Sequence, residues 1–147
     1  MLTVNDLLKY KGRDVYSVSP DTPTLAALAL MAEKNIGAVL VLDGKKMAGI
    51  VSERDIVRQI ASQGSCNLNQ PVEQYMTELL YVVSPGQTIN DCMDLMSKKH
   101  IRHLPILEND EVIGLISIGD VVKHLIADHQ STIVNLENYI TGSGYGQ

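Results

Sequence analysis

Two stretches of the chain repeat one order of apolar and polar positions. In each, a short β-prone segment ends at Ser-Pro, a segment of helical periodicity follows, and two apolar runs precede a final helical stripe. The apolar runs at residues 38–42 and 103–107 are nearly continuous, which is typical of strands buried on both faces. Each stretch is therefore predicted to be a β-α-β-β-α repeat.

The spacing of apolar residues predicts which helix faces are buried. In the first helix of each repeat, apolar side chains recur at positions i, i+3, i+4 and i+7. These residues are Thr24, Ala27, Leu28 and Met31 in the first repeat and Ile89, Cys92, Met93 and Met96 in the second. The closing helices carry one apolar stripe each. It consists of Ile56, Val57, Ile60 and Ala61 in one helix and of Val121, Val122, Leu125 and Ile126 in the other.

The remaining elements follow from turn signals. Segments 15–18 and 80–83 are expected to be short strands that stop at Ser-Pro, and Pro105 must lie where the ladder needs no N–H. Turns at Asp43-Gly44 and Glu108-Asn109-Asp110 lead into further strands. Those strands are expected at 46–51 and 112–116. A short helical segment at 72–76 follows Pro71 and has its counterpart at 4–8.

The two stretches are copies of one sequence unit. A shift of 65 residues aligns Tyr16–Val57 with Tyr81–Val122 without a gap, and 13 of the 42 positions are identical. A unit of this size cannot bury both faces of its sheet alone. We therefore expect an α/β (α+β) fold in which the two repeats are related by a pseudo-two-fold, with the sheets packed together and helices flanking them. The expected divisions are 1–65, 66–130 and 131–147.

The last of these divisions has no counterpart in the repeat. A heptad-like spacing of apolar positions and one histidine begins before this division and continues into it, at Val122, Ile126, His129, Ile133, Leu136 and Ile140. The pattern fits a helix folded back on its own domain as well as one that pairs with a partner helix.

Composition narrows the class of protein. The chain has 45% apolar residues but no Trp and no Phe, so the core must be aliphatic. A net charge of −5 without a cluster of Lys and Arg argues against nucleic-acid binding. No apolar run approaches the ~20 residues of a membrane span, and the N-terminus lacks the pattern of a signal peptide. With Cys66 and Cys92 interpreted as two reduced thiols, we expect a cytoplasmic protein.

Each repeat ends in Gly-x-x-Ser-x-x-Asp at a predicted strand–helix junction, first Gly49-Ile50-Val51-Ser52-Glu53-Arg54-Asp55 and then Gly114-Leu115-Ile116-Ser117-Ile118-Gly119-Asp120. Ser followed three residues later by an acidic residue is a helix capping pattern, which is a purely structural role. A helix N-terminus is also a site for phosphate, and a carboxylate there can bind the two hydroxyls of a ribose. The junctions therefore have two interpretations, capping and nucleotide binding.

The doubled unit with these junctions resembles a CBS-domain pair, or Bateman module, of the stand-alone type. Ser-Pro after the first strand, Met76-Thr77 and Ile101-Arg102-His103-Leu104-Pro105 also fit that family. The resemblance implies regulatory binding of AMP, ADP or ATP, with NAD or S-adenosylmethionine as other ligands. It also implies a homodimer, an effector protein that the sequence does not identify, and no prosthetic group.

The resemblance further implies that each site draws on both repeats. One site would combine Ile50, Ser52, Arg54 and Asp55 with Tyr81, Ile101, Arg102 and His103. The other would combine Leu115, Ser117 and Asp120 with Tyr16, Ile36, Gly37 and Ala38. The first set holds three potential cations and the second none. We therefore expect the Asp55 site to bind the more highly charged phosphate chain and the Asp120 site to bind more weakly or to stay empty.

Other functions find less support in the sequence. His100-x-x-His103 lacks a third ligand at useful spacing, so no metal site is predicted, and His100 is expected at a solvated helix end. No nucleophile elbow, phosphate-binding P-loop or dinucleotide fingerprint is present, so a non-enzyme is expected. The alternative to a nucleotide sensor is a structural or protein-interaction module in which the clefts are vestigial.

Overall fold

The computed structural model describes residues 2–78 and 81–128. Its elements, in chain order, are α1 (Val4–Lys11), β1 (Ser17–Val18), α2 (Thr24–Lys34), β2 (Ala38–Asp43), β3 (Lys46–Ser52), α3 (Glu53–Gln63), the 3-10 helix η1 (Val72–Gln74), α4 (Ile89–Lys99), β4 (His103–Glu108) and β5 (Glu111–Ser117). Residues 118–128 are helical as well. The mixed α/β fold and the two-fold repetition of its elements are confirmed. The heptad-like seam beyond residue 128 lies outside the described residues.

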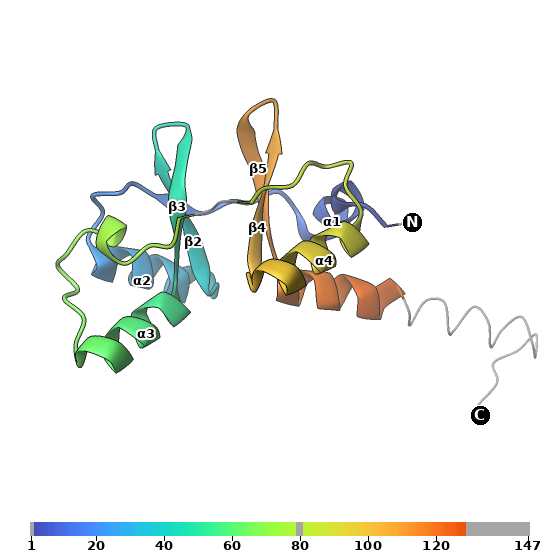
Figure 1. The fold of residues 1–147 in the computed structure, drawn as a ribbon. Helices are drawn as coiled ribbons and strands as arrows, with labels where there is room; N and C mark the ends of the chain where they lie inside the picture. The colour runs from blue at the N-terminus through green and yellow to red at the C-terminus, as the bar shows by residue number, and fades with distance from the viewer. Residues whose placement is uncertain (1, 79–80, 129–147) are drawn as a thin grey trace, which may run out of the picture. The chain divides into compact units, whose positions relative to one another are not determined.

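The described part of the chain divides into two compact units (Figure 1). The first unit consists of residues 14–82 and 109–113 and carries the first repeat. The second unit combines the N-terminal residues up to 13 with 83–108 and 114–128. Helix α1 therefore belongs to the unit of the second repeat, although it precedes the first repeat in the sequence. The predicted packing of one sheet on the other concerns the arrangement of the units and stays a prediction.

In the first unit the strand order is β1-β2-β3, with β1 parallel and β3 antiparallel to β2. Strand β1 is shorter than the predicted 15–18, because it pairs with β2 only at Ser17 and Val18 before Pro20 ends it. In the second unit β4 pairs with β5. Of the predicted strand at 80–83, only Val83 forms a bridge, parallel to Ile106, and residue 80 lies outside the described residues.

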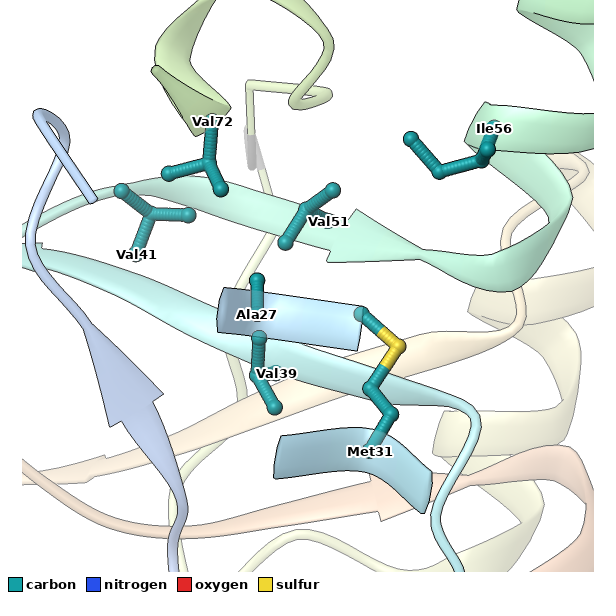
Figure 2. Packing of buried hydrophobic residues seen from close by; sticks show 7 residues of the cluster. All are labelled: Ala27, Met31, Val39, Val41, Val51, Ile56 and Val72. Atoms are coloured by element: carbon teal, nitrogen blue, oxygen red, sulfur yellow. The ribbon is translucent and has the colours of Figure 1, made fainter. Parts of the chain in front are cut away.

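The core of each unit is aliphatic, as predicted. Figure 2 shows the cluster of buried residues in the first unit, which consists of Ala27, Met31, Val39, Val41, Val51, Ile56 and Val72. Their counterparts in the second unit are all buried too. These are Cys92, Met96, Leu104, Ile106, Ile116, Val121 and Val4. The repeat therefore preserves the apolar character of the core position by position, although most side chains differ.

The segment that precedes each repeat packs on the other repeat, and it does so through the same backbone contacts in both units. In the first unit the Val72 N–H donates to the Thr22 carbonyl, and in the second the Val4 N–H donates to the Gln87 carbonyl, both at 2.8 Å. Antiparallel bridges join Pro23 to Pro71 and Thr3 to Thr88. The predicted equivalence of 4–8 and 72–76 is thus confirmed in part, although only Val72–Gln74 is helical, as a single 3-10 turn.

The closing helices differ from the expectation in one respect. Only Ile56 and Val121 of the predicted stripes are buried. Val57 and Val122 are 64% and 46% exposed, because each helix meets its own sheet mainly through its first turn. The stripes are therefore apolar surface within each described unit.

Candidate functional site

In the first unit the strand–helix junction is closed by a capping box. The Asp55 N–H donates to Ser52 Oγ at 3.2 Å, and the Ser52 N–H donates back to Asp55 Oδ2 at 2.9 Å. The Ser52 hydroxyl also donates to Asp55 Oδ2, at 3.0 Å. The N–H of Glu53, at the start of the helix, has no acceptor within the helix. It donates to the carbonyl of Gly37 at 3.0 Å.

The second unit repeats this geometry. The Asp120 N–H donates to Ser117 Oγ at 3.1 Å, and the Ser117 N–H donates to Asp120 Oδ2 at 2.8 Å. The Ile118 N–H binds the carbonyl of Arg102 at 2.9 Å, as the Glu53 N–H binds Gly37 in the first unit. The capping interpretation of both Ser-x-x-Asp segments is therefore confirmed.

The glycine of each motif makes room for the segment exchanged between the repeats. A Cβ atom at Gly49 would lie 2.6 Å from the backbone oxygen of Thr77. A Cβ atom at Gly114 would lie 2.7 Å from Cδ2 of Leu8. Both distances are shorter than real Cβ contacts allow, so a larger residue would require a shift of the backbone at Thr77 in the first unit and of the Leu8 side chain in the second. The glycine thus allows the segment that precedes the other repeat to lie beside the Ser and the Asp of the motif.

The two exchanged segments bring different groups to the two carboxylates. In the first unit residue 77 pairs with Ile50 in both directions, and the Thr77 hydroxyl donates to Asp55 Oδ1 at 3.0 Å. In the second unit Lys11, at the end of α1, reaches Asp120 instead. Its ammonium lies 2.5 Å from Asp120 Oδ2 and also donates to the Leu115 carbonyl.

The ion pair changes the acidity of Asp120. Burial raises the pKa of this carboxyl, but hydrogen bonds from Lys11 and from the Ser117 N–H, together with the charge of Lys11, outweigh that effect. The pKa of Asp120 therefore lies below its ordinary value. The carboxylate is ionised at neutral pH and is already bound by a cation of the same unit.

Lys11 is a site residue that the sequence analysis missed. It lies 109 residues from Asp120 in the chain and precedes the first repeat. The 65-residue shift pairs position 11 with Met76 and so gives no sign of a role. The match of segment 4–8 to segment 72–76 could have revealed it. If each segment had been expected to pack on the repeat that it does not precede, α1 would have been placed beside Asp120.

The other predicted residues fall beside the junctions of their own repeat. Ile36, Gly37 and Ala38 lead into β2 next to α3, while Ile101, Arg102 and His103 lead into β4 next to the helix at 118–128. Ile50 is buried in β3, and Leu115 is half-buried in β5. Tyr16 and Tyr81 are half-buried, and Lys34 Nζ lies 5.4 Å from the centre of the Tyr16 ring. The predicted combination of residues from both repeats depends on how the units are arranged and stays a prediction.

The histidines and acidic residues that the structure describes do not form a metal centre. Within residues 2–78 and 81–128, no three His, Cys, Asp or Glu side chains gather closely enough to hold an ion. His100 is the exposed C-cap of α4, as predicted, with the left-handed backbone that Asn35 also has at the end of α2. His124 packs on Tyr10 with ring centroids 5.3 Å apart. Over the same two ranges, no helix has the length and hydropathy of a membrane span.

Comparison with known proteins identifies the repeats. The family model of the CBS domain matches residues 4–62 and 72–127. The mitochondrial CBS domain-containing protein CBSX3 of Arabidopsis thaliana is 34% identical over 97% of this chain and 73% of its own length. The CBS-domain containing protein ATU1752 of Agrobacterium tumefaciens is 40% identical and superposes with a TM-score of 0.79, covering 84% of this chain and 98% of that one.

A more distant structure shows the same fold with ligands bound. The CBS domain pair of MJ0100, in complex with 5-methylthioadenosine and S-adenosyl-L-methionine, is 18% identical to this chain. It superposes with a TM-score of 0.75 over 87% of this chain and 98% of its own. At that identity the similarity concerns the fold alone.

Proposed function

The chain belongs to the CBS-domain family, and on that premise we propose that it is a regulatory module that binds an adenine nucleotide at its two Ser-x-x-Asp junctions. The observation that carries the proposal is the doubled junction itself. In each unit a strand ends in a serine, a helix begins, and a carboxylate lies in its first turn.

The chemistry of the junctions fits a nucleoside phosphate. Asp55 and Asp120 would accept hydrogen bonds from the two ribose hydroxyls, and the Ser hydroxyl with the helix N-terminus would receive phosphate. Ile50 and Leu115 precede the serines and would contact the base. The MJ0100 pair, which has the same fold, binds 5-methylthioadenosine and S-adenosylmethionine, so an adenosine-type ligand is the first candidate to test.

We further propose that the protein is a binding module and not an enzyme, and that it acts as a homodimer. The exposed apolar residues on the closing helices support a dimer. In the first unit these are Val57 and Ile60, and in the second Ile118, Val122 and Ile126. Apolar residues repeated along one helix are typical of surfaces that pack against another subunit. We also propose that the module acts on an effector protein, which the sequence does not identify.

One observation favours the alternative, a structural module. The polar atoms that a nucleotide would need are already engaged within the chain, because Asp55 binds Ser52 and Thr77 while Asp120 binds Ser117 and Lys11. On this alternative the junctions only cap helices and hold the exchanged segments. A nucleotide would then have no effect on the stability of the protein.

A thermal-shift assay separates the two functions. AMP, ATP, NAD and S-adenosylmethionine are added in turn, each at 1 mM. A ligand present at a hundred times its Kd stabilises the folded state by about 2.7 kcal/mol, which raises the melting temperature by several degrees. We expect such a rise with AMP or ATP. No rise with any of the four ligands supports the structural alternative, and a rise only with NAD or S-adenosylmethionine redirects the proposal to that ligand.

A further inference from the structure

The two junctions differ in one charge that their shared motif does not show. The group that approaches Asp55 is the neutral hydroxyl of Thr77, whereas the group that approaches Asp120 is the ammonium of Lys11. The first turn of α3 adds Glu53 and Arg54, and the corresponding residues Ile118 and Gly119 carry no charge. Lys11 is therefore a charge at the Asp120 junction that the motif itself does not contain.

Resting on the proposed function, we propose that Lys11 sets the charge selectivity of the Asp120 site, which favours a nucleoside phosphate over the uncharged nucleoside. The ribose diol must bind the carboxylate that Lys11 now holds. With an uncharged nucleoside, Lys11 would lose its carboxylate partner and keep only the neutral carbonyl of Leu115. With a nucleoside phosphate, the displaced ammonium finds a new anionic partner beside the sugar.

The position of Lys11 permits this exchange without a rearrangement of the fold. Lys11 is the last residue of α1, and its side chain is 29% exposed. A lysine stem is long and flexible and ends in a point charge, so the ammonium can move from a carboxylate to a nearby phosphate. The buried residues of α1, Val4, Leu7 and Leu8, keep the helix in place while the side chain moves.

The second unit also places Arg102 at this junction, where its carbonyl receives the Ile118 N–H. The corresponding residue of the first unit is Gly37. The count of cations in the sequence analysis assigned none to the Asp120 site. Lys11 adds a cation to the Asp120 site. The site therefore has a cation whether or not Arg102 also contributes to it.

The test measures the ratio of AMP affinity to adenosine affinity at a single site. Asp55→Ala leaves the Asp120 site as the intact one, and isothermal titration at low ionic strength gives both affinities. We expect AMP to bind more tightly than adenosine, and Lys11→Thr to lower the ratio by about five- to tenfold. Lys9→Thr serves as the matched control and should leave the ratio unchanged, because Lys9 lies two residues earlier in α1 and is not among the groups that change the acidity of Asp120.

A reciprocal variant tests the inference in the other unit. In an Asp120→Ala background, Thr77→Lys should raise the ratio of AMP to adenosine affinity at the Asp55 site. Circular dichroism verifies that each variant is folded, and Lys11→Met replaces Lys11→Thr if the latter is not. If both ligands bind and the ratio in the Lys11 variants stays within twofold of its original value, the selectivity inference is overturned and the proposed function stands. If neither ligand binds the wild-type protein, the proposed function fails and the inference fails with it.

Discussion

The two units have the same scaffold and different chemistry at the same place. All seven residues of the buried cluster in the first unit have buried counterparts in the second, and both junctions form the same capping box. The exchanged segments differ. In the first unit a backbone ladder at Thr77 lies against β3, whereas in the second the helix α1 contributes a leucine side chain at Gly114 and a lysine at Asp120.

This difference shows that the repeat constrains packing more than it constrains the site. A core position accepts many aliphatic side chains of suitable volume, so both units keep their cores with different residues. The group that meets each carboxylate comes from outside the repeat and is free to be a hydroxyl or an ammonium. Similar units can therefore have sites of different selectivity.

Replacing the glycine of each motif should reveal the largest difference in stability between the two units. In Gly49→Ala the new methyl group meets the backbone oxygen of Thr77, a residue that forms two backbone hydrogen bonds with Ile50, so we expect a loss of about 3 kcal/mol of stability or more. In Gly114→Ala it meets a leucine methyl group, which can rotate away, and about half that loss is expected. Urea unfolding of both variants measures the difference. Equal losses would show that the two segments are held in the same way.

The buried cysteine of the second unit should react much more slowly than the half-buried cysteine of the first unit. Burial, and then the charge of Asp91, raises the pKa of Cys92 to about 11, whereas Cys66 is only half-buried. A thiol with a pKa two units above its ordinary value has about a hundredfold less thiolate at pH 8. Labelling with iodoacetamide followed by peptide mass spectrometry should modify Cys66 first. Equal labelling rates would mean that the buried Cys92 is exposed to the reagent as readily as the half-buried Cys66.

The smallest expected effect concerns acid stability. The pKa of Asp120 is lowered in the folded state, so its contribution is complete above the ordinary value of 3.8 and is lost as the pH falls through the folded value. Lys11→Met should therefore cost up to about 1 kcal/mol at pH 7, which is typical of a partly exposed ion pair, and less at pH 3. Thermal melts at both values measure this. Lys45→Met, in the β2–β3 turn, is the control, and a Lys11 effect that does not shrink at pH 3 would contradict the assignment.

Much of the fold could be predicted from the sequence, because its signals are local or periodic. Helix spacing at Ile89, Cys92 and Met96 and the apolar run at 38–42 each correspond to an observed element. The capping boxes were visible as Ser-x-x-Asp. The pair Lys11–Asp120 was not, since it joins a lysine before the first repeat to an aspartate at the end of the second. A contact of that kind depends on the exchange of segments, which no local pattern encodes.

The burial of the closing helices also could not be predicted. The stripe that begins at Ile56 has the period of a buried face, and its later residues are nevertheless exposed within the unit. Periodicity shows that a face is apolar but does not show whether the same unit covers it. The proposed homodimer would account for such a face.

The central claim is that the Ser-x-x-Asp junctions bind an adenine nucleotide. The most direct measurement is isothermal titration of AMP into the wild-type protein and into the Asp55→Ala, Asp120→Ala double variant, with both shown to be folded. Saturable binding to the wild type that disappears in the double variant is the predicted result. Unchanged affinity in the double variant, or no binding heat with the wild type, would contradict the claim.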